Sequence, residues 1–89
     1  MERFTATYSG FVQGVGFRFT ARRMASGFPI GGHVRNLPDG TVELVAEGEL
    51  SEIERFLAAI EDRMSGHIQA KDLRREPVHA PAADFRILV

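Results

Sequence analysis

The sequence predicts an α+β sandwich in which two helices cover one face of an antiparallel sheet of four or five strands. Segments in which apolar and polar side chains alternate, as in strands, are separated by two segments in which apolar residues recur at helical offsets. The chain has 89 residues and no cysteine, so it must hold one modest core together by packing alone. Residues 1–89 are therefore expected to form a single domain.

The first strand and the first helix are expected on either side of a glycine-rich loop. Apolar and polar side chains alternate over residues 4–12, which predicts a strand. Apolar residues at helical offsets over residues 17–28 predict a helix, and we expect Gly27 to end it in a left-handed conformation. The loop between these elements belongs to the stretch GFVQGVGFR, residues 10–18.

The middle of the chain predicts a hairpin of two strands. Residues 30–36 and an alternating segment that starts at Val42 are joined by residues 37–40, LPDG. In such a turn proline presets its own φ, and glycine tolerates a positive φ. These features are typical of two strands that pair through a short connection.

A second helix and two further strand signals follow the hairpin. Residues 51–54, SEIE, fit a capping box, and an apolar stripe then runs to Met64, before Gly66, which predicts a helix. Residues 68–75 give a weak strand signal. Residues 85–89 alternate clearly and predict a last strand.

This order of elements is that of the ferredoxin-like arrangement, βαββαβ, with a possible extra strand. The arrangement places the third strand between the first and the second, so that the first and second strands run in the same direction. Their carboxyl ends then lie at the same edge of the sheet. The loop from Gln13 to Arg18 follows the first strand and Asn36 closes the second, so these distant residues are expected to be neighbours.

The loop has the composition of an anion-binding site. Gly14 and Gly16 permit positive φ, so that successive backbone N–H groups can point into one concave site at the start of a helix. Arg18 adds a planar, permanently charged guanidinium that matches two phosphate oxygens. Val15 and Phe17 are expected to pack beneath the loop and hold it rigid. The spacing alone leaves open that the glycines form a plain turn and that Arg18 is a surface charge.

Two stretches resemble the signatures of the acylphosphatase family. Residues 10–18 are similar to the first signature, a glycine and any residue followed by VQGV-x-FR. Residues 32–36, GHVRN, followed by residues 40–42, GTV, and by Gly48, are similar to the second. The resemblance covers nearly the whole chain and implies a ferredoxin-like fold. It also implies an enzyme that hydrolyses carboxyl-phosphate anhydrides to a carboxylate and inorganic phosphate, without a metal or a cofactor.

The resemblance also implies roles for particular residues. Arg18 would bind the phosphoryl group, and Asn36 would orient the attacking water. The amide of Asn36 has an acceptor and two donors but no useful acid–base pKa, which suits alignment of a water rather than its deprotonation. The expected phosphate-binding residues are Gln13, Gly14, Val15, Gly16, Phe17 and Arg18. The alternative for Asn36 is a hairpin residue that ties its own turn.

Charge is distributed unevenly along the chain. Residues 1–36 contain five arginines and one glutamate, whereas the whole chain has a net charge of -1. Such asymmetry suits an anionic ligand bound near the first third of the chain, and the alternative is that these charges only form solvated faces. The family resemblance implies that the ligand is a small-molecule acyl phosphate as substrate and inorganic phosphate as product. A wide nucleic-acid footprint needs more basic charge, so no nucleic-acid partner is expected.

Two departures from the family pattern keep a second function open. His33 stands where the family usually has a large aromatic residue, and Phe11 stands where a polar or basic residue is common. His33 could alter packing beside the site, add pH dependence, or be a structural strand residue. The alternative function is a catalytically silent phosphate-binding or regulatory domain of the same fold. The stretch GVGFRF, residues 14–19, also loosely resembles the aromatic strand motif of RNA-recognition domains, but here the phenylalanines flank a glycine loop.

The sequence predicts no metal site and no membrane segment. The histidines show no ligand spacing with one another. The N-terminus, MERFTATYS, lacks the apolar core of a signal peptide, and no apolar run is long enough to span a membrane. We therefore expect a cytoplasmic protein without a membrane partner. We also expect a monomer, although the sequence leaves the oligomeric state open.

Overall fold

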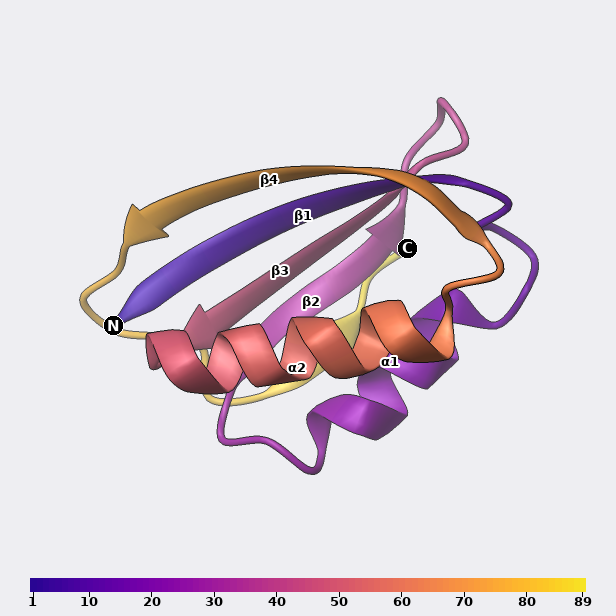
Figure 1. Cartoon of the computed structure of the whole chain (residues 1–89). Coiled ribbons are helices and arrows are strands. Elements are labelled where there is room, and N and C mark those ends of the chain that lie inside the picture. Colours follow the sequence, from indigo (N-terminus) through magenta and orange to yellow (C-terminus); the bar gives the residue numbers. More distant parts are fainter.

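The computed structural model describes all 89 residues and consists of one sheet covered on one face by two helices (Figure 1). The strands are β1 (Glu2–Gly10), β2 (Gly31–Asn36), β3 (Val42–Gly48), β4 (Ile68–Pro77) and β5 (Phe85–Ile87), and the helices are α1 (Phe17–Ala25) and α2 (Leu50–Arg63). The strand order across the sheet is β4-β1-β3-β2-β5. The predicted ferredoxin-like arrangement, including the fifth strand, is therefore confirmed.

The central strand, β3, lies between β1 and β2 and is antiparallel to both. The strands β1 and β2 consequently run in the same direction. Their carboxyl ends meet at one edge of the sheet, because Tyr8 near the end of β1 and Asn36 at the end of β2 are both paired with Val42 of β3. The expected proximity of these two strand ends is confirmed.

The prediction of an antiparallel sheet is wrong for one pair of strands. The outermost strand, β5, pairs with β2 in parallel. The reason is the path of the chain between the last two strands. Strand β4 ends at Pro77, opposite Glu2, at the end of the sheet where β2 begins. Residues 78–84 cross that end of the sheet, so β5 starts beside the start of β2 and must run the same way.

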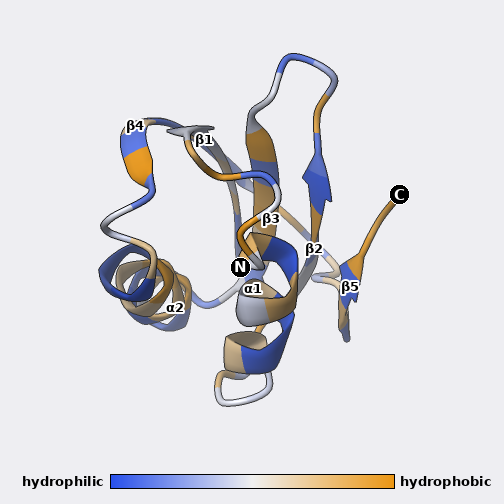
Figure 2. Cartoon of the chain, turned by 90° about the vertical axis from the view of Figure 1, so that its right-hand side faces the viewer, coloured by the Kyte–Doolittle hydropathy of each residue, from blue (hydrophilic) through white to orange (hydrophobic).

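The core lies between the sheet and the helices. Phe4, Ala6 and Tyr8 alternate inward along β1 and are almost fully buried, as the sequence pattern predicts. The rings of Tyr8 and Phe17 lie 5.4 Å apart between centroids, which packs the first residue of α1 directly against β1. Figure 2 shows the two helices side by side on the same face of the sheet.

Several element ends differ from the sequence prediction, among them an end of each helix. Helix α2 begins at Leu50, not after a capping box at Ser51, and its N-cap residue Glu49 makes no side-chain cap hydrogen bond. Leu50 packs against the core, and the first turn of the helix starts two residues earlier than the capping box predicts. Helix α1 ends at Ala25 without a left-handed Gly27, because consecutive backbone turns continue through Phe28 instead.

Strand β1 ends two residues earlier than predicted, at Gly10. Its register with β4 shifts between Ser9 and Gly10, and Gly10 has a φ of 120°. A Cβ at Gly10 would lie 2.5 Å from the carbonyl oxygen of His67, so only glycine allows this close approach of the backbones. The chain then turns away from the sheet into the glycine-rich loop.

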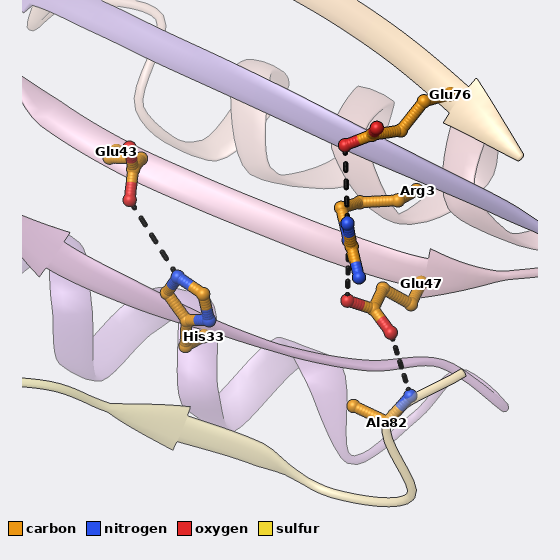
Figure 3. A network of polar contacts seen from close by, with 6 residues as sticks. All are labelled: Arg3, His33, Glu43, Glu47, Glu76 and Ala82. Carbon is orange, nitrogen blue, oxygen red and sulfur yellow. Dashed lines mark hydrogen bonds and ion pairs between the residues drawn. The ribbon is translucent and has the colours of Figure 1, made fainter. Parts of the chain in front are cut away.

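A polar network on the outer face of the sheet fixes the segment that leads into β5 (Figure 3). Arg3 Nε donates a hydrogen bond to Glu47 Oε2 at 2.8 Å, and the backbone N–H of Ala82 donates to Glu47 Oε1 at 2.8 Å. Arg3 also donates to Glu76 at 3.2 Å. Burial raises the pKa of Glu47, but the hydrogen bonds from Arg3 and Ala82 and the positive charge of Arg3 outweigh it and hold the pKa below its ordinary value.

We expect Glu47→Gln to remove a pH-dependent part of the stability. A carboxyl whose pKa is lowered by folding stabilises the native state above its unfolded pKa, ordinarily 4.5, and loses that contribution as the pH falls through the lower native pKa. The free energy of unfolding should therefore be about 1–2 kcal/mol lower in the variant at pH 7. The difference should shrink as the pH falls below the unfolded value.

Urea unfolding of the wild type and the variant between pH 3 and pH 7 measures this difference. Glu76→Gln is the matched control, because Glu76 accepts from the same arginine but its side chain is 61% exposed. That control should change little at any pH. A constant wild-type-to-variant difference from pH 3 to pH 7 would show that the charge of Glu47 contributes nothing.

Candidate active site

The glycine-rich loop, residues 11–16, connects β1 to α1 at the edge of the sheet where β1 and β2 end. Gly14 and Gly16 have φ values of 76° and 80°, in the left-handed region. A Cβ at either position would meet no atom within 4 Å, so these glycines are required by backbone conformation and not by lack of space. The expected positive φ at both residues is confirmed.

Gly16 is also the N-cap residue of α1. Its carbonyl accepts the first helical hydrogen bond, from the N–H of Thr20 at 2.9 Å. The first turn of α1 contains no acidic residue, and the unpaired N–H groups of a helix start favour negative charge. The loop therefore ends in an electrostatic environment that suits an anion.

Arg18 and Asn36 line the same small cavity. Its volume is about 170 Å³, and its lining residues are Val12, Gly14, Gly16, Phe17, Arg18, Phe19 and Asn36. The structure thus brings together the loop glycines, Arg18 from α1 and Asn36 from β2, as the topology argument predicts. The side chain of Arg18 is half-buried and forms no ion pair with any carboxylate of the protein. Its charge is left free for a ligand.

The side chain of Asn36 has no hydrogen-bond partner within the protein. The turn after β2 is tied by other residues, because Asp39 Oδ1 accepts from the N–H of Thr41 at 3.0 Å and from its hydroxyl at 2.6 Å. These hydrogen bonds lower the pKa of Asp39. The alternative of Asn36 as the residue that ties its own turn is therefore not what the structure shows.

Gln13 links the loop to the β2–β3 hairpin. Its side-chain Nε2 donates to the carbonyl oxygens of Leu37 and Thr41, both at 2.9 Å. The sequence predicts only a phosphate-binding role for Gln13, through its backbone, and does not predict this side-chain contact. One feature of the sequence could have indicated this contact. The ends of the first two strands are expected to meet, and an amide side chain near them can donate two hydrogen bonds.

The two apolar residues of the loop behave differently. Phe17 is 2% exposed and packs beneath the loop, as expected. Val15 was expected to do the same, but it is 37% exposed. Val15 lies between two left-handed glycines, and all three residues, 14–16, are exposed. Phe19, for which the sequence predicts no role in the site, is 70% exposed and lines the cavity.

The two residues that depart from the family pattern lie away from the cavity lining. His33 precedes the inward-facing Val34 and lies on the outer face of the sheet, where its Nε2 is 3.6 Å from Glu43 Oε1 (Figure 3). Asn36 shares the inward parity of Val34, so His33 and Asn36 lie on opposite faces. Phe11 is 72% exposed, and its N–H donates to the carbonyl of His67.

Neither a metal cluster nor a membrane helix is found. No three histidine, aspartate or glutamate side chains are grouped as metal ligands would be. No helix of the structure combines the length and apolar character needed to cross a membrane.

The fold and this site define a class of protein, a ferredoxin-like α+β domain with an open glycine loop, an arginine and an amide at one sheet edge. The family model described as Acylphosphatase matches residues 4–87. The chain therefore belongs to the acylphosphatase family.

Individual relatives agree with this assignment. The chain is 45% identical over 73 residues to an acylphosphatase of Methanospirillum hungatei, covering 82% of this chain and 80% of the relative. It is 38% identical over 87 residues to an acylphosphatase of Paenarthrobacter aurescens, covering 97% and 93%. The crystal structure of acylphosphatase from Bacillus subtilis is similar with a TM-score of 0.88 over 100% of both chains, at 26% identity.

Proposed function

We propose that this acylphosphatase hydrolyses acyl phosphates in the cavity shared by Arg18 and Asn36. The products are a carboxylate and inorganic phosphate. The observation that supports the proposal best is that the loop glycines, the unpaired Arg18 and the unpaired amide of Asn36 line one cavity. All of these groups come from one chain, so a single chain is sufficient as the catalytic unit.

The phosphoryl group is held by charge and by backbone donors. The guanidinium of Arg18 offers two parallel N–H donors to two phosphate oxygens. The N–H groups of residues 13–18 add further donors, because the left-handed glycines curve the backbone around the site. Together they stabilise negative charge on the equatorial oxygens as the bond to the leaving group breaks.

Asn36 positions the water. Its amide oxygen accepts a hydrogen bond from one O–H of the water, which orients an oxygen lone pair toward phosphorus. The water oxygen forms a bond to phosphorus while the bond from phosphorus to the bridging oxygen breaks. A phosphate oxygen of the substrate takes the water proton, and the carboxylate leaves with the bond electrons.

No general acid is required by this mechanism. A carboxylate is a stable leaving group whose conjugate acid has a low pKa, so it departs without protonation. The cavity lining contains neither a carboxylate nor a histidine. Alkyl phosphate monoesters have alkoxide leaving groups that need a proton donor, and they should be poor substrates.

The proposal predicts hydrolysis of benzoyl phosphate in the presence of a chelator. An alkyl phosphate monoester should be hydrolysed at a rate near the background. Release of inorganic phosphate from each compound, with EDTA and with added magnesium, measures both rates. An activity that disappears with EDTA and returns with magnesium would contradict the proposed mechanism.

A further inference from the structure

A basic groove continues from the candidate active site along α1. Its volume is about 740 Å³, and it shares Gly16 and Phe19 with the smaller cavity. Its other lining residues come from α1, from the residue after it and from the end of α2; they are Thr20, Arg22, Arg23, Met24, Ser26 and Arg63. Three arginines and no carboxylate therefore line a surface that is continuous with the phosphate loop.

The arginines of the groove have no carboxylate partner, unlike most other lysine and arginine residues of the protein. Of the 11 lysine and arginine residues, seven lie within 4.0 Å of a carboxylate. The remaining four are Arg18, Arg22, Arg23 and Arg63, and every one of them lines the cavity or the groove. The lysine and arginine side chains without a carboxylate partner are thus confined to one continuous surface, where they attract anions.

The residues of α1 are arranged on this surface in order along the helix axis. Arg22 lies one helical turn beyond Arg18 on the same side of the helix, about 6 Å further along its axis. Between the two ends, Phe19 is 70% exposed and lines both the cavity and the groove. A ligand whose phosphoryl group is bound at Arg18 would place an apolar middle on Phe19 and its far end beside Arg22 and Arg63.

We propose that the basic groove is a subsite for the acyl end of the substrate. It selects acyl phosphates whose acyl group ends in a second anionic group, a carboxylate or a phosphate. This inference rests on the proposed function, because it takes Arg18 and the loop as the site of the phosphoryl group. The loop recognises the phosphoryl group, which all acyl phosphates share. The groove is the part of the surface that can distinguish one acyl group from another.

The test compares 4-carboxybenzoyl phosphate with 4-methylbenzoyl phosphate. The two substrates have the same rigid ring and differ in the charge at its far end. We expect Arg22→Gln/Arg63→Gln to lower kcat/KM for the carboxylate substrate about threefold to tenfold, mainly through KM, because exposed ion pairs are individually weak. The kcat/KM for the methyl substrate should be unchanged. Raising the KCl concentration should reduce the preference of the wild type for the carboxylate substrate.

The double variant Arg74→Gln/Arg86→Gln is the matched control. It removes the same charge from β4 and β5, at residues that do not line the groove. An equal loss with both substrates, an equal loss in the control, or no loss at all would overturn the subsite. If the wild type hydrolyses the methyl substrate, the proposed function stands whatever becomes of the subsite. If it hydrolyses neither substrate, both proposals are wrong.

Discussion

Replacing Arg18 with glutamine should lower kcat/KM for benzoyl phosphate about a thousandfold, because the charge that faces the phosphoryl oxygens is deleted. Glutamine keeps much of the length and hydrogen-bonding capacity of arginine. Arg18 forms no ion pair in the protein, so its loss leaves no buried carboxylate unpaired. The fold should therefore survive, and steady-state kinetics should report a loss at the site.

Inorganic phosphate gives the same prediction a readout that does not depend on catalysis. A ligand that binds the native state alone adds about 2.7 kcal/mol to the free energy of unfolding at a hundredfold excess over Kd. For a domain of this size the melting temperature then rises by roughly ten degrees or more. The wild type should show this shift with phosphate and with sulfate, but not with chloride at matched ionic strength.

Arg18→Gln should lose the specific shift, and Arg74→Gln should keep it. The Arg74→Gln control removes the same charge from β4, where the side chain of Arg74 is 82% exposed. If the wild type and Arg18→Gln gain the same stability from phosphate over chloride, the anion acts by exclusion from the surface. The role assigned to Arg18 would then be wrong.

Replacing Asn36 with alanine should lower kcat about a hundredfold or more, because the attacking water loses the group that orients it. Arg18 and the loop remain in this variant, so phosphate should still raise the melting temperature. The stability without ligand should change little, since the Asn36 side chain has no hydrogen-bond partner in the protein and Asp39 and Thr41 tie the turn.

The two site variants should therefore separate binding from water positioning. Arg18→Gln should lose catalysis and phosphate binding together, whereas Asn36→Ala should lose catalysis alone. Paired measurements of kcat and of phosphate inhibition distinguish the two patterns. Turnover near that of the wild type in Asn36→Ala would remove the amide from the mechanism.

Much of the fold follows from local patterns. Alternation of apolar side chains in β1 and the apolar stripe of α2 predict their inner faces, because a strand and a helix each bury one face. The hairpin between β2 and β3 follows from a turn whose residues favour it locally. The strand order, which brings Asn36 beside the loop, follows from the order of these elements.

Other features depend on contacts between residues far apart in the sequence. The parallel pairing of β5 depends on how residues 78–84 cross the end of the sheet, with Ala82 held by Glu47. The earlier start of α2 depends on where Leu50 meets the core. No local pattern contains these contacts, because their partners are brought together only by the folded chain.

The sequence by itself determined the candidate site as a set of residues, through the positive-φ glycines, Arg18 and Asn36 in family-like stretches. Only the tertiary structure decided how the site is supported and extended. The side chain of Gln13 ties the loop to two carbonyls of the hairpin, and Arg63 of α2 joins the arginines of α1 along one groove. The physical reason is that a backbone conformation is specified by local residue types, whereas a side-chain bridge or a shared surface requires two segments that only tertiary packing places together.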